Sequence, residues 1–208
     1  METTLEIRWF APGPAPGALA GWFDDLGAPA PSHRTDTYLL LAGADDLGLK
    51  LREGGEAFEL KRRRDDGGDA GLDISAEGTP ELWQKWSFPV DDASCRAAAL
   101  GLPASSLVDV EKERRLLTYR LASDGAIALV KDREGEGCSV ELTTLMVKGS
   151  DWWTFGFEAF GDEARLTDAL TATASAFFAG TTVAKILALA PSCGYPAWLA
   201  TVTAASTP

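Results

Sequence analysis

The chain of 208 residues is 46% hydrophobic and 24% charged, an ordinary composition for a globular protein that can bury a core. Its formal net charge of −12 argues against nucleic-acid binding, because affinity for a phosphate backbone depends on Lys and Arg. No apolar run approaches the roughly 20 residues of a membrane helix, so no membrane partner is expected. The N-terminal METTLEIRWF is a strand pattern and not a leader peptide, which predicts a soluble, cytoplasmic protein.

The first half of the chain predicts short strands separated by turns. A strand is expected at about residues 3–10, followed by a Pro/Gly loop and an amphipathic helix at 17–26 that Gly27 ends. Four further strands are expected in TDTYLLL, LGLKLRE, EAFELKRRR and ELWQKWSF. DDASCRAAAL then predicts a helix whose acidic start caps its free amide groups.

The second half predicts strands first and helices afterwards. The strands are expected in LVDVEKERRLLTYRL, AIALVKD, CSVELTTLMVKG and WWTFGFEAF. Asp162 is the expected N-cap of a helix with an apolar stripe, and a second helix is expected at about 182–190. We therefore expect one domain over residues 1–208, with strands over about 3–160 and C-terminal helices over about 162–205.

Several of these strands carry two cations on one face and apolar side chains on the other. Side chains alternate between the faces of a strand, so each x-K-x-R pattern aims both cations the same way. The pattern in GLKLRE, FELKRRR and VEKERR pairs Lys50 with Arg52, Lys61 with Arg63, and Lys112 with Arg114. TLEIRWF sets Glu6 and Arg8 against apolar neighbours in the same way. The repetition predicts a sheet with one cationic face, and hence an anion site.

The direction of this cationic face separates two interpretations. If it points to solvent, the opposite faces form an ordinary core and the lysines protect strand edges. If it points inward, helices must cover the apolar faces outside, and carboxylates or an anion must offset the repulsion. Glu6, Glu141 and Glu158 lie in strand patterns where they could do so. The inward interpretation predicts an α+β fold, an antiparallel β-barrel of about eight strands with helices packed outside and a charged lumen.

The order of the motifs resembles the CYTH family, the triphosphate tunnel enzymes. Proteins of that family carry, in order, E-x-E-x-K, D-x-Y-like and L-R-x-R-like strands, a strand with an inward Lys, a helix ending in an LG-like turn, a K-x-R strand and late carboxylates. The matching pieces here are TLEIRWF, TDTYLLL, GLKLRE, FELKRR, AAALGLPASSLVDVEKERRLLTY and CSVELTTL. The resemblance implies a β-tunnel in which Lys and Arg hold a triphosphate and glutamates hold a divalent metal.

The chain departs from the family pattern at the carboxylates. The first family glutamate falls on Thr4 and the family lysine on Arg8, while the late E-x-E pair becomes Glu141-Leu142-Thr143. Mg²⁺ is usually held by carboxylates, phosphate oxygens and water, so this loss predicts retained anion binding with weakened metal catalysis. The remaining candidate ligands of Mg²⁺ or Mn²⁺ are Glu6, Glu141 and Glu158, whose alternative role is charge balance.

The resemblance implies binding of a small phosphorylated anion, an organic phosphate or polyphosphate. The expected anion ligands are Arg8, Lys50, Arg52, Lys61, Arg63, Lys112 and Arg114. If the protein is an enzyme, it is expected to be a metal-dependent triphosphatase that polarises a phosphoryl group while the cations neutralise developing charge. The alternative is a non-catalytic scaffold or protein-interaction domain that keeps the fold.

Other residues favour no competing chemistry. His33 is the only histidine, lies in a loop pattern and is expected at the surface. Without a G-x-S-x-G sequence or a P-loop, neither a serine hydrolase nor a P-loop nucleotide site is expected. Lys85 shares its strand face with Trp83 and Ser87, which leaves its role open. The three cysteines form no C-x-x-C pair, which indicates neither a disulfide framework nor a zinc knuckle.

Overall fold

The computed structural model describes residues 1–52, 56–64, 76–89 and 106–204. The first half contains β1 (Glu2–Pro12), α1 (Gly17–Asp25), β2 (Ser32–Leu39), β3 (Leu47–Arg52), β4 (Ala57–Arg64) and β5 (Glu81–Pro89). The second half contains β6 (Leu107–Leu121), β7 (Ile127–Val130), β8 (Gly137–Val147), β9 (Ser150–Phe160), a 3-10 turn η3 (Glu163–Arg165), α3 (Leu166–Phe178), α4 (Val183–Leu187) and α5 (Tyr195–Ala204). The helix expected in DDASCRAAAL lies outside the described residues.

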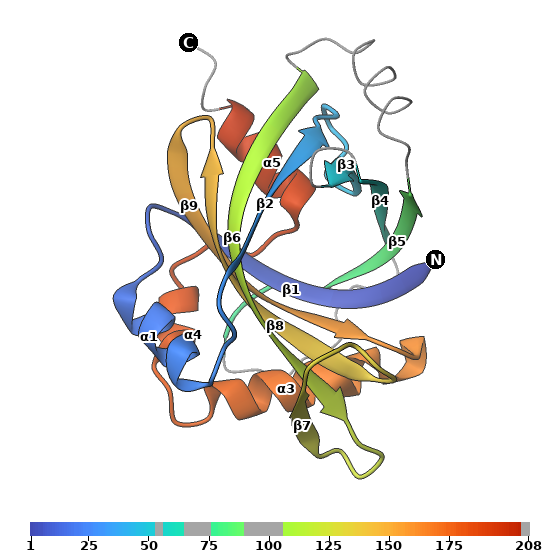
Figure 1. The fold of residues 1–208 in the computed structure, drawn as a ribbon, viewed down its shortest axis with the longest axis vertical. Coiled ribbons are helices and arrows are strands. Elements are labelled where there is room, and N and C mark those ends of the chain that lie inside the picture. Colours follow the sequence, from blue (N-terminus) through green and yellow to red (C-terminus); the bar gives the residue numbers. More distant parts are fainter. Residues whose placement is uncertain (53–55, 65–75, 90–105, 205–208) are drawn as a thin grey trace.

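The strands form one antiparallel sheet that closes into a barrel (Figure 1). Its order is β2-β3-β4-β5-β1-β9-β8-β6-β7, and an additional pairing between β2 and β6 joins the sheet into an eight-stranded ring. That pairing runs from Ser32 opposite Arg114 to Leu39 opposite Leu107. Among the described strands, β7 has β6 as its one partner and stands outside the ring. The predicted α+β barrel is therefore confirmed.

Most of the apolar strand faces point outward and are covered by helices. On β1, Leu5, Ile7 and Trp9 are buried in a core cluster that also contains residues of α1, α3 and α4. Figure 1 shows α3 along the lower side of the barrel, with α1 and α4 beside it. Burying the apolar faces on the outside leaves the opposite, charged faces of the same strands in the interior, because side chains alternate along a strand.

Local sequence signals set the ends of the outer helices. Asp162 accepts a hydrogen bond from the backbone N–H of Ala164 at 3.0 Å, as expected of an N-cap, and α3 follows directly after this turn. Gly27 adopts a φ of +76°, the left-handed conformation that commonly ends a helix, two residues after the last residue of α1.

Helix α5 differs from the other helices because it packs against the inner faces of the strands. Trp198, Leu199 and Val202 form a second core cluster with Phe10 of β1 and Val110 of β6. Phe10 shares its strand face with Arg8, and Val110 shares its face with Lys112, so these apolar side chains point into the barrel. Figure 1 shows α5 within the curl of the strands at the upper end. The helix therefore fills one end of the barrel.

Candidate functional site

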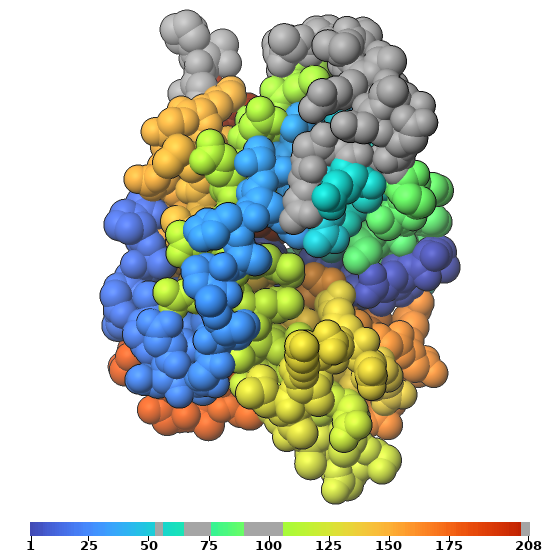
Figure 2. Space-filling view, viewed as in Figure 1, coloured from blue at the N-terminus to red at the C-terminus, as the bar shows by residue number. Residues whose placement is uncertain are grey.

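The barrel encloses a charged cavity of about 230 Å³ next to the beginning of α5. Nine cations line it: Arg8, Arg34, Lys50, Arg52, Lys61, Lys85, Lys112, Arg114 and Arg133. Five carboxylates also line it: Glu6, Glu59, Glu81, Glu141 and Glu158. Figure 2 shows a hollow near the centre of one face of the molecule, between β2 and the segment of β3 and β4. Among the described residues, the cavity wall thus carries four more positive than negative charges.

Most of the cations singled out from the sequence lie on this wall. Six of the seven expected anion ligands line the cavity: Arg8, Lys50, Arg52, Lys61, Lys112 and Arg114. Arg63 does not line it but donates to Glu81, which does, at 2.7 Å. Lys85, whose role the sequence left open, lines the cavity together with Trp83.

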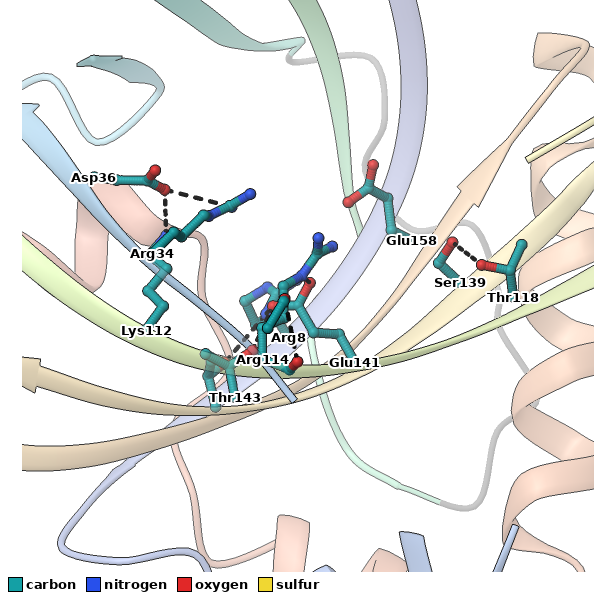
Figure 3. A network of polar contacts seen from close by, with 12 residues as sticks. Arg8, Arg34, Asp36, Lys112, Arg114, Thr118, Ser139, Glu141, Thr143 and Glu158 are labelled. Atoms are coloured by element: carbon teal, nitrogen blue, oxygen red, sulfur yellow. Dashed lines mark hydrogen bonds and ion pairs between the residues drawn. The ribbon is translucent and has the colours of Figure 1, made fainter. Parts of the chain in front are cut away.

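Glu141 accepts hydrogen bonds from three side chains of the site. Arg114 Nε donates to one of its oxygens at 2.6 Å, and Arg8 Nη1 donates to the other at 3.1 Å. Thr143 donates to that second oxygen at 2.8 Å. Burial opposes the charge of this carboxylate, but Arg114 and Arg8 hold the pKa of Glu141 well below its usual range. Figure 3 shows these side chains converging where strands from three parts of the sequence meet.

A glycine between the two strands allows Arg8 to reach Glu141. Strand β9 lies between β1 and β8, and Gly156 of β9 is the cross-strand partner of both Arg8 and Glu141. A Cβ atom on Gly156 would lie 3.2 Å from Cζ and Nε of Arg8. The absence of a side chain at this position therefore gives the guanidinium its path across β9.

Glu6 of β1 forms an ion pair with Lys61 of β4. Lys61 Nζ lies 2.5 Å from Glu6 Oε1, and Thr4 donates to the same oxygen at 2.8 Å. Burial opposes protonation of Lys61, but Glu6 and Glu158 raise its pKa, so the ammonium stays charged. Thr4 and Thr143 are the positions at which the sequence departs from the motif pattern. Thr4 donates a hydrogen bond to Glu6, and Thr143 donates one to Glu141.

Glu158 lies directly opposite Glu6 in the pairing of β1 with β9, and an arginine from a loop binds it. Arg133 Nη2 donates to Glu158 at 2.8 Å, and Arg133 Nε donates to Ser139 at 3.2 Å. Burial opposes the charge, but Lys61 and Arg133 lower the pKa of Glu158. Arg133 was not predicted from the sequence, because it stands between two strands, where no alternation marks the direction of its side chain.

Asp36 anchors a second group of cations on the wall formed by β2, β3 and β6. Its side chain is fully buried, and one oxygen lies 2.9 Å from Lys112 Nζ, 3.0 Å from Lys50 Nζ and 3.4 Å from Arg34 Nη2. Figure 3 shows the contacts of Asp36 with Lys112 and Arg34. These three cations outweigh the effect of burial and lower the pKa of Asp36. The alternation of Arg34, Asp36 and Tyr38 in HRTDTY was the signal that could have predicted this group.

The expectation that His33 lies in a loop was wrong. Strand β2 begins at Ser32, three residues before the expected TDTYLLL, because it continues its pairing with β6 as far as Arg114. His33 is exposed, as expected, and lies opposite Glu113. The earlier start of β2 is what brings Arg34 onto the cavity wall.

Aromatic side chains form the wall of the cavity next to α5. Tyr38 and Tyr195 stack with ring centroids 5.7 Å apart, and Lys112 Nζ lies 4.2 Å from the centroid of Tyr195. Burial raises the pKa of Tyr195, so its hydroxyl keeps its proton and remains a donor. Among the described residues, this buried hydroxyl has no hydrogen-bond partner, and neither has the buried Nε of Arg8 or of Arg34.

The three carboxylates expected to hold a metal do not fit that role. Glu6, Glu141 and Glu158 each bind at least one cationic side chain. Within the described part of the chain, no three His, Cys, Asp or Glu side chains are grouped so that they could hold a metal ion. A divalent ion would also enter a wall that already carries surplus positive charge. In this structure the three glutamates balance the charges of neighbouring cations.

No protein-family model and no curated protein matches the chain. Among solved structures, the PH1012 protein of Pyrococcus horikoshii is 14% identical over 88% of this chain and 93% of its own, with a TM-score of 0.45. A Bacillus halodurans protein provisionally described as an adenylate cyclase is 15% identical over 85% of this chain and 91% of its own (TM-score 0.40). The Pct1 RNA triphosphatase of S. pombe is 10% identical over 90% of this chain and 81% of its own (TM-score 0.36).

The fold and the site together define a closed β-barrel with a charge-lined interior. This is the architecture that the motif order of the sequence predicted. None of the described helices is both long and apolar enough to cross a membrane. The charges of the cavity wall and the ion pairs of its glutamates come from this chain's own residues.

Proposed function

We propose that the protein binds a small polyanion, an organic phosphate or polyphosphate, in the barrel cavity. The observation that carries the proposal is the excess of cations over carboxylates among the described residues of the wall. Behind the wall, Asp36 and Glu2 pair with wall cations and Arg63 pairs with a wall carboxylate, so the formal surplus falls from four charges to three. Two like charges about 4 Å apart repel by roughly 4 kcal/mol at an effective dielectric constant of 20. A bound anion would offset this repulsion.

The buried donors of the wall support an acceptor-rich ligand. Arg8 Nε, Arg34 Nε and Tyr195 Oη are buried and have no partner among the described residues. An unpaired buried donor costs about 1–3 kcal/mol, so a ligand that accepts from them recovers that free energy. A phosphate group offers three acceptor oxygens, and arginine presents a planar fork that matches them.

The size of the cavity favours a short ligand. Its volume of about 230 Å³ is below the 300–1,000 Å³ of sites for drug-sized molecules. Helix α5 fills one end of the barrel, so a long polymer has no straight path through it. A polyphosphate of a few units or the terminal phosphates of a larger molecule fit these limits better than an extended nucleic acid.

The ion pairs of the glutamates favour binding over hydrolysis. Because the expected metal ligands bind cations, the residues that the structure describes supply no place from which a metal would polarise a phosphoryl group. The second candidate function, a non-catalytic scaffold or protein-interaction domain, is favoured by the same observation. The two candidates differ in whether the cavity binds phosphates.

Calorimetry with tripolyphosphate, thiamine triphosphate and ATP tests the proposal. We expect at least tripolyphosphate to bind, with an affinity that falls as salt is added. Arg34→Gln is the informative variant, because Asp36 keeps Lys50 and Lys112 as partners after the change. Losing one hydrogen bond between charged groups should cost about 1.5–3 kcal/mol, roughly 10- to 150-fold in Kd.

Arg115→Gln is the matched control for this experiment. Arg115 pairs with Asp24 of α1 on the outside of the barrel and does not line the cavity. We expect its affinity for tripolyphosphate to equal that of the unaltered protein. Absence of heat with all three ligands, or an equal loss in both variants, would refute the anion site and leave the scaffold.

A further inference from the structure

We infer that anion binding in this cavity requires no divalent metal, because Arg8 takes the place beside Glu141 that a metal would need. The inference rests on the proposed function and deepens it by naming the form of the ligand. The protein would bind the free polyanion and not its complex with Mg²⁺ or Mn²⁺.

The position of Arg8 carries this inference. Its guanidinium crosses β9 over Gly156 and donates to Glu141 at 3.1 Å, while Arg114 holds the other carboxylate oxygen at 2.6 Å. With Thr143 also donating, three donors surround one carboxylate. A metal ion at Glu141 would have to share this carboxylate with two arginines or displace them, and in either case their charges would remain in the same cavity.

The other two carboxylates are held in the same manner. Glu6 binds Lys61, and Glu158 binds Arg133, which reaches it from the loop before β8. Glu6 and Glu158 face each other across β1 and β9, the kind of carboxylate pair that could share a metal. Here each of the two has its own cation, so the pair is neutralised by side chains.

Arg8 can serve the ligand as well as the carboxylate. Its side chain is 7% exposed and lines the cavity, and Nη1 bonds Glu141 while Nε has no partner among the described residues. The guanidinium has five N–H donors, so it can neutralise Glu141 and still donate to an anion. In a metal-dependent site a divalent ion bridges carboxylate and phosphate. Arg8 is placed to make the same bridge with hydrogen bonds.

The test compares tripolyphosphate binding to the full chain in EDTA and in excess Mg²⁺ by calorimetry. We expect binding in EDTA, and no tightening when Mg²⁺ is added, because the metal in solution competes with the protein for phosphate oxygens. Electron paramagnetic resonance of Mn²⁺ supplies a second readout, in which the protein alone should not immobilise the ion. Arg8→Gln should weaken tripolyphosphate binding about tenfold or more in EDTA, while Arg115→Gln should not.

The outcomes separate the inference from the proposed function. Binding that appears only with Mg²⁺, or that Mg²⁺ tightens about tenfold, would overturn the inference and leave the anion site standing. Absence of binding in both solutions would overturn both. If Arg8→Gln does not fold, Arg133→Gln takes its place in the tripolyphosphate titration in EDTA. The Arg133 side chain is about one-third exposed, so its replacement should disturb folding less, and it leaves Glu158 without this cation. The comparison of EDTA with Mg²⁺ needs no variant.

Discussion

Helix α5 holds one end of the barrel closed, and its Trp198 packs against aromatic side chains of β1 and β9. Trp198 is 2% exposed and stacks on Phe10 of β1 with ring centroids 4.7 Å apart and planes 8° from parallel. The edge of Trp152 of β9 meets it at 5.8 Å. Trp198→Ala should therefore lower the free energy of unfolding by about 3–5 kcal/mol, the range for truncating a buried aromatic side chain.

A second substitution at the same position separates packing from hydrogen bonding. The indole Nε1 of Trp198 is buried and has no hydrogen-bond partner among the described residues. Trp198→Phe keeps an aromatic ring against Phe10 and removes this donor, whose burial costs about 1–3 kcal/mol. That gain opposes the smaller loss of packed volume, so we expect Trp198→Phe to cost about 1 kcal/mol or less.

Urea unfolding followed by circular dichroism measures both changes as shifts of the midpoint at constant m-value. Leu189→Ala is the control, because Leu189 is 88% exposed and should change stability by no more than about 0.5 kcal/mol. If Trp198→Ala costs less than about 1 kcal/mol, α5 does not pack inside the barrel, and the reasoning on a closed end is wrong.

Two further predictions concern the charged interior. Gly156→Ala should destabilise the protein by about 1–3 kcal/mol, because the new Cβ crowds Arg8 and the backbone oxygen of Ile7. Urea unfolding measures this loss of stability. The loss should shrink in an Arg8→Gln background if the crowding of Arg8 is its cause. Stability should fall as the pH drops below about 4, because the carboxyl pKa values of Asp36 and Glu141 are lower in the folded than in the unfolded protein. Their contribution is complete above the unfolded pKa and is lost as the pH falls through the folded value. Thermal melts from pH 7 to 3 that show constant stability would contradict this.

The alternation of residues predicted most of the strands and which cations share one strand face. LVDVEKERRLLTYRL corresponds to β6 over its whole length, and Lys112 and Arg114 both reach the cavity from it. The prediction of β6 and of its shared cationic face succeeded because a strand with one apolar face has only one register that buries that face. Arg133 was missed because its direction depends on the path of a loop and on Glu158, which is distant in sequence.

The partners of the carboxylates could not be predicted in the same way. The sequence indicated that Glu6, Glu141 and Glu158 could hold a metal or balance charge. Which of the two applies depends on the distance from each carboxylate to a cation on another strand, such as Arg8 crossing to Glu141 over Gly156. Register between strands far apart in the chain sets such distances, and no local pattern records it.

By itself, the sequence determined the strands, the outer helices and the existence of a cationic face, because these follow from local periodicity and capping. Only the tertiary structure decided that the face lines a closed cavity, that α5 fills one end of it, and that cations neutralise the glutamates. The physical reason is that closure, plugging and ion pairing all depend on contacts between distant segments, such as β2 with β6 and Trp198 with Phe10.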